Sequence, residues 1–122
     1  MRDFAIVASN KFKVSSTKAN GIKINNYYYA GKSAKIYNQL AKQTAVDSMK
    51  LFTKKYGPYP YSELDLTESP FGSDTGGMEY SGLVMIAQDT FARKKAASKE
   101  DYDSVIENVS HEVAHQWFFN TV

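Results

Sequence analysis

The spacing of hydrophobic residues changes several times along the chain, and each change predicts a new element. Short stretches that are apolar, or that alternate between apolar and polar residues, are typical of strands. Five such stretches occur, the second of which either continues the first or pairs with it: residues 4–9, 11–16, 22–30, 63–69 and 82–88. The sequence "KANG" at residues 18–21 predicts a turn between two of them.

Helical spacing begins after Gly31, and Ser33 is a suitable N-cap. The predicted helix ends at Tyr56, because Gly57 fits the position after a helix and Pro58 cannot continue one. Its apolar face would be formed by residues that recur at intervals of three and four: Tyr37, Leu40, Ala41, Thr44, Ser48, Leu51, Phe52 and Tyr56. One apolar face on about twenty residues implies packing on a sheet or another helix.

A final helix is predicted from about Asp101 or Tyr102 into "HEVAHQWFF", with Ser98 or Asp101 as its cap. Its core-facing stripe would contain Val105, Ile106, Val109, Val113 and Trp117. The stretch at 69–77 is a loop by composition, and residues 92–101 form a charged connector. The pattern therefore predicts an α+β fold: a small twisted sheet of about four or five strands, covered by the helix at 33–56, with the other helix last.

Composition narrows the class of protein without naming a function. The 122 residues are 43% hydrophobic and 23% charged, which is ordinary for a soluble globular chain. A net charge of +2 without a basic stripe argues against nucleic-acid binding. Without cysteine there are no disulfides or thiolate metal sites, and no apolar run approaches the roughly 18 residues of a membrane span. The compartment stays open, although the cytoplasm is favoured.

The sequence "HEVAH" at residues 111–115 is an H-E-x-x-H motif. At about 100° per residue, His111 and His115 fall within about 40° of each other on the predicted helix, so both imidazoles can reach one zinc ion. Glu112 lies on a flank of that face, where its carboxylate can hold a metal-bound water without binding the metal. The motif therefore predicts a Zn²⁺ site with Glu112 as general base.

Two histidines one turn apart can also be a structural pair beside an unrelated glutamate, but the apolar stripe on the opposite side of the helix favours the metal site. Two ligands do not complete such a site, because catalytic zinc normally takes three protein ligands and a water. The chain has no other histidine and no cysteine. A third ligand would be an aspartate or glutamate elsewhere, or a residue beyond Val122.

A second motif, "GGMEY" at residues 76–80, lies about thirty residues before the histidines and is followed by "SGLVMI". By itself it would indicate only a turn before a strand. Together with "HEVAHQWF" and "YGPYPYSELD" at residues 56–65, it resembles the zinc aminopeptidases of peptidase family M1, the gluzincins that include aminopeptidase N. Members of that family carry a G-x-M-E-N type motif upstream of H-E-x-x-H.

The resemblance implies roles for the residues that match. His111 and His115 would be zinc ligands, and Glu112 would be the general base. Glu79 would bind the free α-amino group of the substrate, because a carboxylate fixed near the zinc favours a positively charged N-terminus. The implied substrates are peptides with a free N-terminus.

The rest of the upstream motif would also bind substrate. Gly76, Gly77 and Met78 would present backbone groups to the bound peptide, since only glycine lets a main chain approach a ligand so closely. Tyr80 belongs to the same substrate-binding motif, although it stands where the commonest form of the family has asparagine; bacterial members often carry the tyrosine.

The resemblance also implies that this chain is a fragment. The family's third zinc ligand is a glutamate nineteen positions after the second histidine, which would fall twelve residues beyond Val122. Residues 1–17 would be a junction strand or the tail of a preceding β-rich domain, and residues 18–122 the first part of a thermolysin-like catalytic domain. Such a piece would be inactive or nearly so, with weak zinc affinity. Its exposed apolar surface would fit the missing C-terminal part of the same protein, or cause dimerisation.

Two alternatives stay open. The first is a zinc endopeptidase built on the same helix. Glu79 argues against it, because a carboxylate at the amine position favours a free amine and disfavours internal peptide bonds. The second is a non-catalytic binding module that retains the motif, against which the intact His111, Glu112 and His115 argue.

Overall fold

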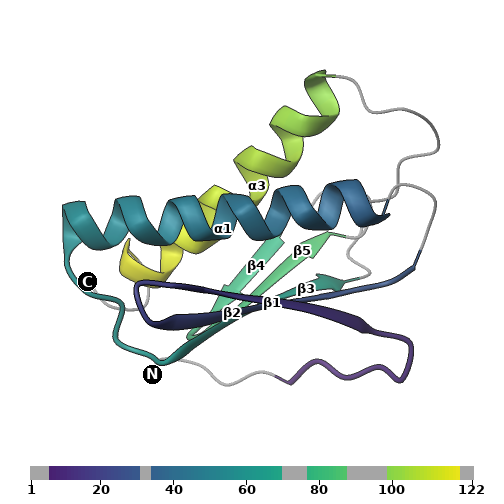
Figure 1. The fold of residues 1–122 in the computed structure, drawn as a ribbon, viewed down its shortest axis with the longest axis horizontal. Coiled ribbons are helices and arrows are strands. Elements are labelled where there is room, and N and C mark those ends of the chain that lie inside the picture. Colours follow the sequence, from purple (N-terminus) through teal and green to yellow (C-terminus); the bar gives the residue numbers. More distant parts are fainter. Residues whose placement is uncertain (1–5, 31–33, 70–76, 88–98, 119–122) are drawn as a thin grey trace.

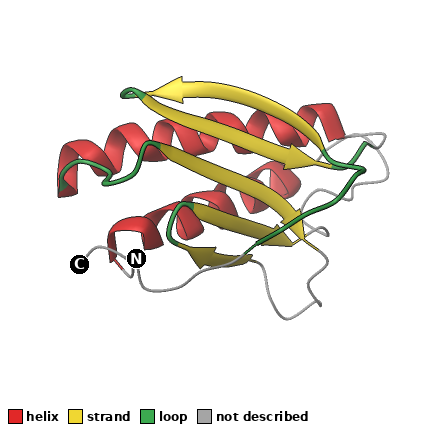
Figure 2. Ribbon diagram, turned by 90° about the horizontal axis from the view of Figure 1, so that it is seen from below, coloured by secondary structure: helices red, strands yellow, loops and turns green. Residues whose placement is uncertain are grey.

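The computed structural model describes residues 6–30, 34–69, 77–87 and 99–118. Within them, two helices cover one face of a five-stranded sheet (Figures 1 and 2). The elements are, in chain order, β1 (Lys13–Ala19), β2 (Ile22–Tyr28), α1 (Ala34–Tyr56), β3 (Glu63–Ser69), β4 (Gly77–Tyr80), β5 (Leu83–Ala87) and α3 (Lys99–Phe118). The predicted α+β class and the sheet of four or five strands are confirmed.

The strands lie in the order β1-β2-β3-β5-β4. The hairpin β1–β2 closes through Asn20 and Gly21, whose positive φ angles of 53° and 78° suit a two-residue turn. β2, β3 and β5 run parallel, and α1 makes the crossover that parallel strands require. β4 pairs antiparallel with β5 and forms an edge of the sheet.

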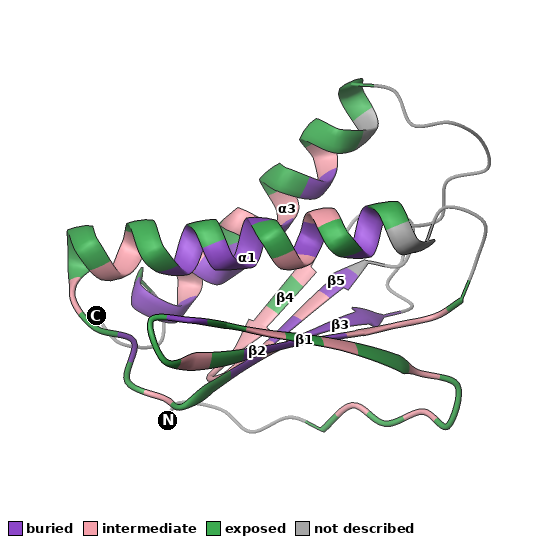
Figure 3. Ribbon diagram, viewed as in Figure 1, coloured by how far each residue is buried: buried purple, intermediate pink, exposed green. Residues whose placement is uncertain are grey.

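The core lies between the sheet and the helices (Figure 3). Alternate residues of the strands point into it, because successive side chains of a strand face opposite sides. The members contributed by β2, β3 and β5 are Ile24, Leu64, Leu66, Val84 and Ile86. α1 contributes Tyr37, Ala41, Ala45 and Met49, all fully buried.

The end of α3 is joined to the end of α1. The backbone N–H of Gly57 donates to Thr53 O, and Gly57 has a φ of 103°, so it ends the helix as predicted. Trp117 Nε1 donates to Gly57 O at 2.9 Å, and its ring packs against Phe52 and Tyr59. This contact fixes the C-terminal part of α3 over the sheet.

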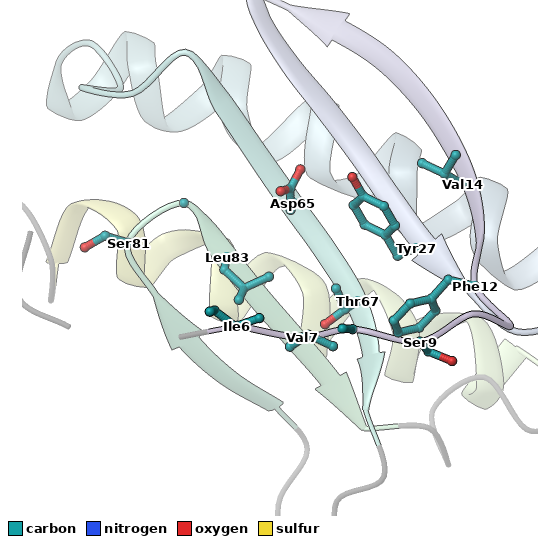
Figure 4. A pocket seen from close by; sticks show the side chains of 12 residues that line it. Ile6, Val7, Ser9, Phe12, Val14, Tyr27, Asp65, Thr67, Ser81 and Leu83 are labelled. Atoms are coloured by element: carbon teal, nitrogen blue, oxygen red, sulfur yellow. The ribbon is translucent and has the colours of Figure 1, made fainter. Parts of the chain in front are cut away.

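A hollow of about 660 Å³ lies on the other face of the sheet, where residues 6–9 cross it (Figure 4). Phe12, Tyr27, Thr67 and Leu83 are among its walls, and Asp65 lines it with a half-buried carboxylate. Burial raises the pKa of Asp65, and Asn25 Nδ2, which donates to it, opposes that shift. None of the H-E-x-x-H residues lines this hollow.

Several predicted details are wrong. Ile6–Ser9 is not a strand, while Phe4 and Ala5 lie outside the described residues. The stretch beginning at Gly77, predicted as loop and motif, is the strand β4. The predicted face of α1 is buried at Tyr37, Ala41, Thr44 and Ser48, but Leu51 and Tyr56 are each 48% exposed, and Ala45 and Met49, which were not predicted, are buried.

The last helix also differs from its prediction. α3 begins at Lys99, earlier than expected, and Ser98 lies outside the described residues. Val105, Val109, Val113 and Trp117 are buried as predicted, but Ile106 is 42% exposed. The boundary predicted at residue 17 falls within β1, and the division into two parts stays a prediction. Neither described helix is both long and apolar enough to cross a membrane.

Candidate active site

The H-E-x-x-H residues lie in the second half of α3, where the helix passes over β4 and β5 (Figure 1). His111 Nε2 and His115 Nε2 are 3.1 Å apart, and the two rings are nearly perpendicular. Two nitrogens that each lie about 2.0–2.1 Å from one tetrahedral zinc ion would be about 3.3 Å apart. The spacing of the two imidazoles therefore fits a shared metal ion.

Glu112 points from α3 toward the edge of the sheet and is only 6% exposed. Its Oε1 atom lies 3.9 Å from His111 Nε2. Its Oε2 atom is buried without a hydrogen-bond partner. A buried carboxylate oxygen without a partner is costly, so this atom is suited to a ligand, a proton or a water.

Glu79 comes to the site from β4. Because side chains alternate along a strand, Gly77 and Glu79 share the face that is turned toward α3, while Met78 points away and is 43% exposed. One ligand atom from each of Glu79, Glu112 and His115 lies within 4.8 Å of the other two. The structure thus brings together residues that are more than thirty positions apart in the sequence.

The two carboxylates change the electrostatics of the site. Burial and, after it, the neighbouring carboxylate of Glu79 raise the pKa of Glu112 to about 8. A cation among these atoms would relieve both effects. Imidazole nitrogens and carboxylate oxygens are donors that zinc binds in proteins, so the residues present fit a zinc ion.

Gly77 lets β4 approach α3 closely. A Cβ atom at this position would lie 2.8 Å from Glu112 Cγ and 2.9 Å from the backbone oxygen of Met85. Both distances are shorter than a normal contact, so a side chain here would displace its neighbours. The close approach that the structure shows at Gly77 is toward the Glu112 side chain, while the approach to a bound peptide stays a prediction.

The remaining members of the upstream motif are placed as follows. Tyr80 is half-buried at the end of β4 and pairs with Leu83 across the turn. Gly76 lies outside the described residues.

His111, the first residue of the H-E-x-x-H motif, has 65% of its side chain exposed, which leaves it accessible from solvent.

Sequence reasoning missed Gln116, which follows His115 directly. This residue is fully buried, and its amide binds the turn between β4 and β5. Its position one turn after Glu112, on a helix whose other buried residues are mostly apolar, was the available signal. A buried glutamine must have hydrogen-bond partners, so its place on the inner face called for an explanation.

Comparisons of the sequence with known proteins identify the family of this chain. The model of the peptidase family M1 domain matches residues 40–122, which is more than half of the chain. Aminopeptidase M1-A of Oryza sativa subsp. japonica is 33% identical over 114 residues, covering 89% of this chain and 12% of that protein. Aminopeptidase 2 of Candida albicans is 38% identical over 80 residues, covering 64% of this chain and 8% of that protein.

A similar match comes from an animal protein. Endoplasmic reticulum aminopeptidase 2 of Bos taurus is 30% identical over 121 residues, covering 97% of this chain and 12% of that protein. The chain therefore spans about an eighth of the length of the curated relatives that match nearly all of it. The family match includes the H-E-x-x-H segment, and the chain belongs to peptidase family M1.

Proposed function

We propose that this chain supplies part of the active site of a zinc aminopeptidase, which removes N-terminal residues from peptides. The observation that carries the proposal is the meeting of Glu79 from β4 with Glu112 and His115 from α3 within 4.8 Å. The names of the relatives, all aminopeptidases, agree with it. A site with imidazole ligands, a buried carboxylate and a second carboxylate beside them is suited to hydrolysis at a positively charged end of a peptide.

His111 and His115 would hold the zinc ion through their Nε2 atoms. When bound, zinc lowers the pKa of a water molecule and polarises the scissile carbonyl group. Glu112 would accept the proton of the attacking water, since its Oε2 atom has no partner within the described protein. Burial of the Glu112 side chain beside the histidines would restrict the positions that its carboxylate can take.

Glu79 would bind the α-amino group of the substrate. An ammonium ion between Glu79 and the catalytic residues gains a charge-assisted hydrogen bond that an internal peptide bond does not make. The edge strand β4 has one side of its backbone unpaired among the described residues, so a peptide can lie along Gly77 and Met78 as an additional strand. Gly76 and Tyr80 would complete this substrate-binding segment.

The experiment compares two substrates on the complete protein that carries this sequence. One is an aminoacyl anilide with a free amino group, and the other is its N-acetylated twin. We expect zinc-dependent cleavage of the free form only, and Glu112→Gln should lower kcat by a factor of at least about 100. The matched control is Glu107→Gln, an exposed position on the same helix, which should leave kcat unchanged.

The other outcomes point to the other functions. Cleavage of the acetylated twin or of internal bonds would show an endopeptidase, and no cleavage of either substrate would leave a binding module. By itself, the chain is expected to be inactive or nearly so and to bind zinc weakly. Catalytic zinc takes three protein ligands, and the sequence has only two histidines and no cysteine.

A further inference from the structure

The turn between β4 and β5 is bound to α3 by one side chain. Gln116 Nε2 donates to the backbone oxygen of Tyr80 at 2.8 Å, and the backbone N–H of Gly82 donates to Gln116 Oε1 at 2.9 Å. The Gln116 side chain is fully buried and the turn is half-buried, so both hydrogen bonds are partly shielded from water. One amide therefore satisfies both an acceptor and a donor of the same turn.

The turn is fixed on its other side as well. The backbone N–H of Asp65 in β3 donates to Gly82 O at 2.9 Å. Gly82 has a φ of 79°, a conformation that side chains rarely adopt, which limits how the turn can rearrange. The turn is thus held between α3 and the centre of the sheet.

The hydrogen bonds of Gln116 join the two segments that carry the site. Tyr80 follows Glu79 directly, and Gln116 follows His115 directly. The distance between the amine-binding carboxylate and the H-E-x-x-H residues therefore depends on this contact. A displacement of about 1 Å between such groups can lower a reaction rate by a factor of about 100.

We propose that Gln116 is a positioning residue that sets the place of Glu79 relative to the metal-binding residues, and thereby the preference for a free N-terminus. This inference rests on the proposed function. Only an amide side chain offers the required donor and acceptor together at this length. A carboxylate lacks the donor for Tyr80 O, and an apolar side chain lacks both groups.

The test measures inhibitor binding to the complete, zinc-loaded protein. Two zinc-binding hydroxamates are compared, one with an α-amino group and one without it. Gln116→Met keeps the length of the side chain. It should raise the dissociation constant of the amino compound by a factor between about 10 and 100 and leave that of the other compound unchanged. Gln116→Glu keeps the acceptor for Gly82 and should give a smaller loss.

A double-mutant cycle with Glu79→Gln shows whether Gln116 acts through Glu79. If it does, Gln116→Met adds little to the loss that Glu79→Gln already causes. Asn26→Leu is the matched control for general destabilisation, because it removes a buried amide of β2 that donates to Asn38 of α1, away from the turn between β4 and β5. Asn26→Leu should weaken the binding of neither compound.

The outcomes separate this inference from the proposed function. If the wild-type protein binds the amino compound no better than the other, the proposed function fails. If the wild type prefers the amino compound and Gln116→Met keeps that preference, or weakens both compounds equally, the inference about Gln116 is overturned. Hydrogen exchange at residues 80–83 confirms that each variant is folded and shows whether the Gly82 amide has lost its partner.

Discussion

The two glutamates of the candidate site have different surroundings although they lie close together. Glu112 is almost fully buried on α3, and its pKa is raised to about 8. Glu79 is half-buried on an edge strand. Pairs of carboxylates in different environments commonly take different roles, and here the buried one suits proton transfer while the more accessible one suits binding of a cation.

Glu79→Gln should remove most of the preference for a free N-terminus. The substitution keeps the size of the side chain and removes the charge that attracts an ammonium ion. We expect kcat/KM for the free aminoacyl anilide to fall by a factor of about 10 to 100, mainly through a higher KM, because hydrogen bonds to charged groups contribute about 1.5–3 kcal/mol. Steady-state kinetics of the complete protein measure this.

The control for this prediction is Glu100→Gln, an exposed position at the start of α3. It removes the same charge far from the site and should not alter KM. A Glu79→Gln protein with unchanged KM for the free substrate would show that Glu79 does not bind the amine.

At the scale of elements, the turn of the β1–β2 hairpin depends on its backbone conformation. Gly21 has a φ of 78°, and a Cβ atom there would meet nothing within 4 Å. Gly21→Ala should therefore destabilise the chain by about 1–2 kcal/mol through backbone strain alone. Urea unfolding followed by the fluorescence of Trp117, the single tryptophan, measures the change.

The comparison with Gly21→Asn isolates the cause. Asparagine tolerates positive φ better than alanine. Gly21→Asn should therefore lower the free energy of unfolding by less than Gly21→Ala does, in spite of the larger side chain. Equal losses for both variants would mean that something other than the backbone angle decides the stability of this turn.

How far the sequence predicts these elements depends on what holds each one in place. The strand at 63–69 and the helix at 33–56 were predicted nearly to the residue, because alternation, Gly57 and Pro58 mark them locally. β4 was missed because four residues that include a glycine are too few for alternation to indicate a strand, and the strand depends on pairing with β5. Ile6–Ser9 has the composition of a strand, but no described strand pairs with it.

In the candidate site, too, the sequence predicts what is set locally and misses what depends on tertiary contacts. The spacing of His111, Glu112 and His115 is set within one helix, so sequence was sufficient to predict that they share a side of it. The approach of Glu79 to that helix is a tertiary contact, and only the resemblance to family M1 indicated it. Gln116 was missed because its partners are backbone atoms of a turn, which leave no pattern in the side chains.

At the scale of the whole molecule, the outer sides of both helices carry exposed apolar side chains. They are Ile36, Leu51, Tyr56, Tyr102, Ile106 and Phe118. A hollow of about 430 Å³ between α1 and α3 lies on the same side and is lined in part by Leu40, Phe52 and Ile106. Whether a further part of the same protein or a second copy covers this surface stays a prediction, and sedimentation of the 122-residue chain at two concentrations would detect the second copy.

The 122-residue chain should bind zinc more weakly than the complete protein does. In the proposed site His111 and His115 would supply two nitrogen ligands, and Glu79 and Glu112 are carboxylates that the described residues place nearby. If those carboxylates act on the substrate and the water, the metal in the chain alone lacks its usual third protein ligand. Calorimetric titration with Zn²⁺ should therefore give a dissociation constant at least about 10-fold higher for the chain, and His115→Ala should abolish binding in both. Equal affinities would mean that Glu79 or Glu112 ligates the metal, and the roles proposed for that glutamate would have to be reassigned.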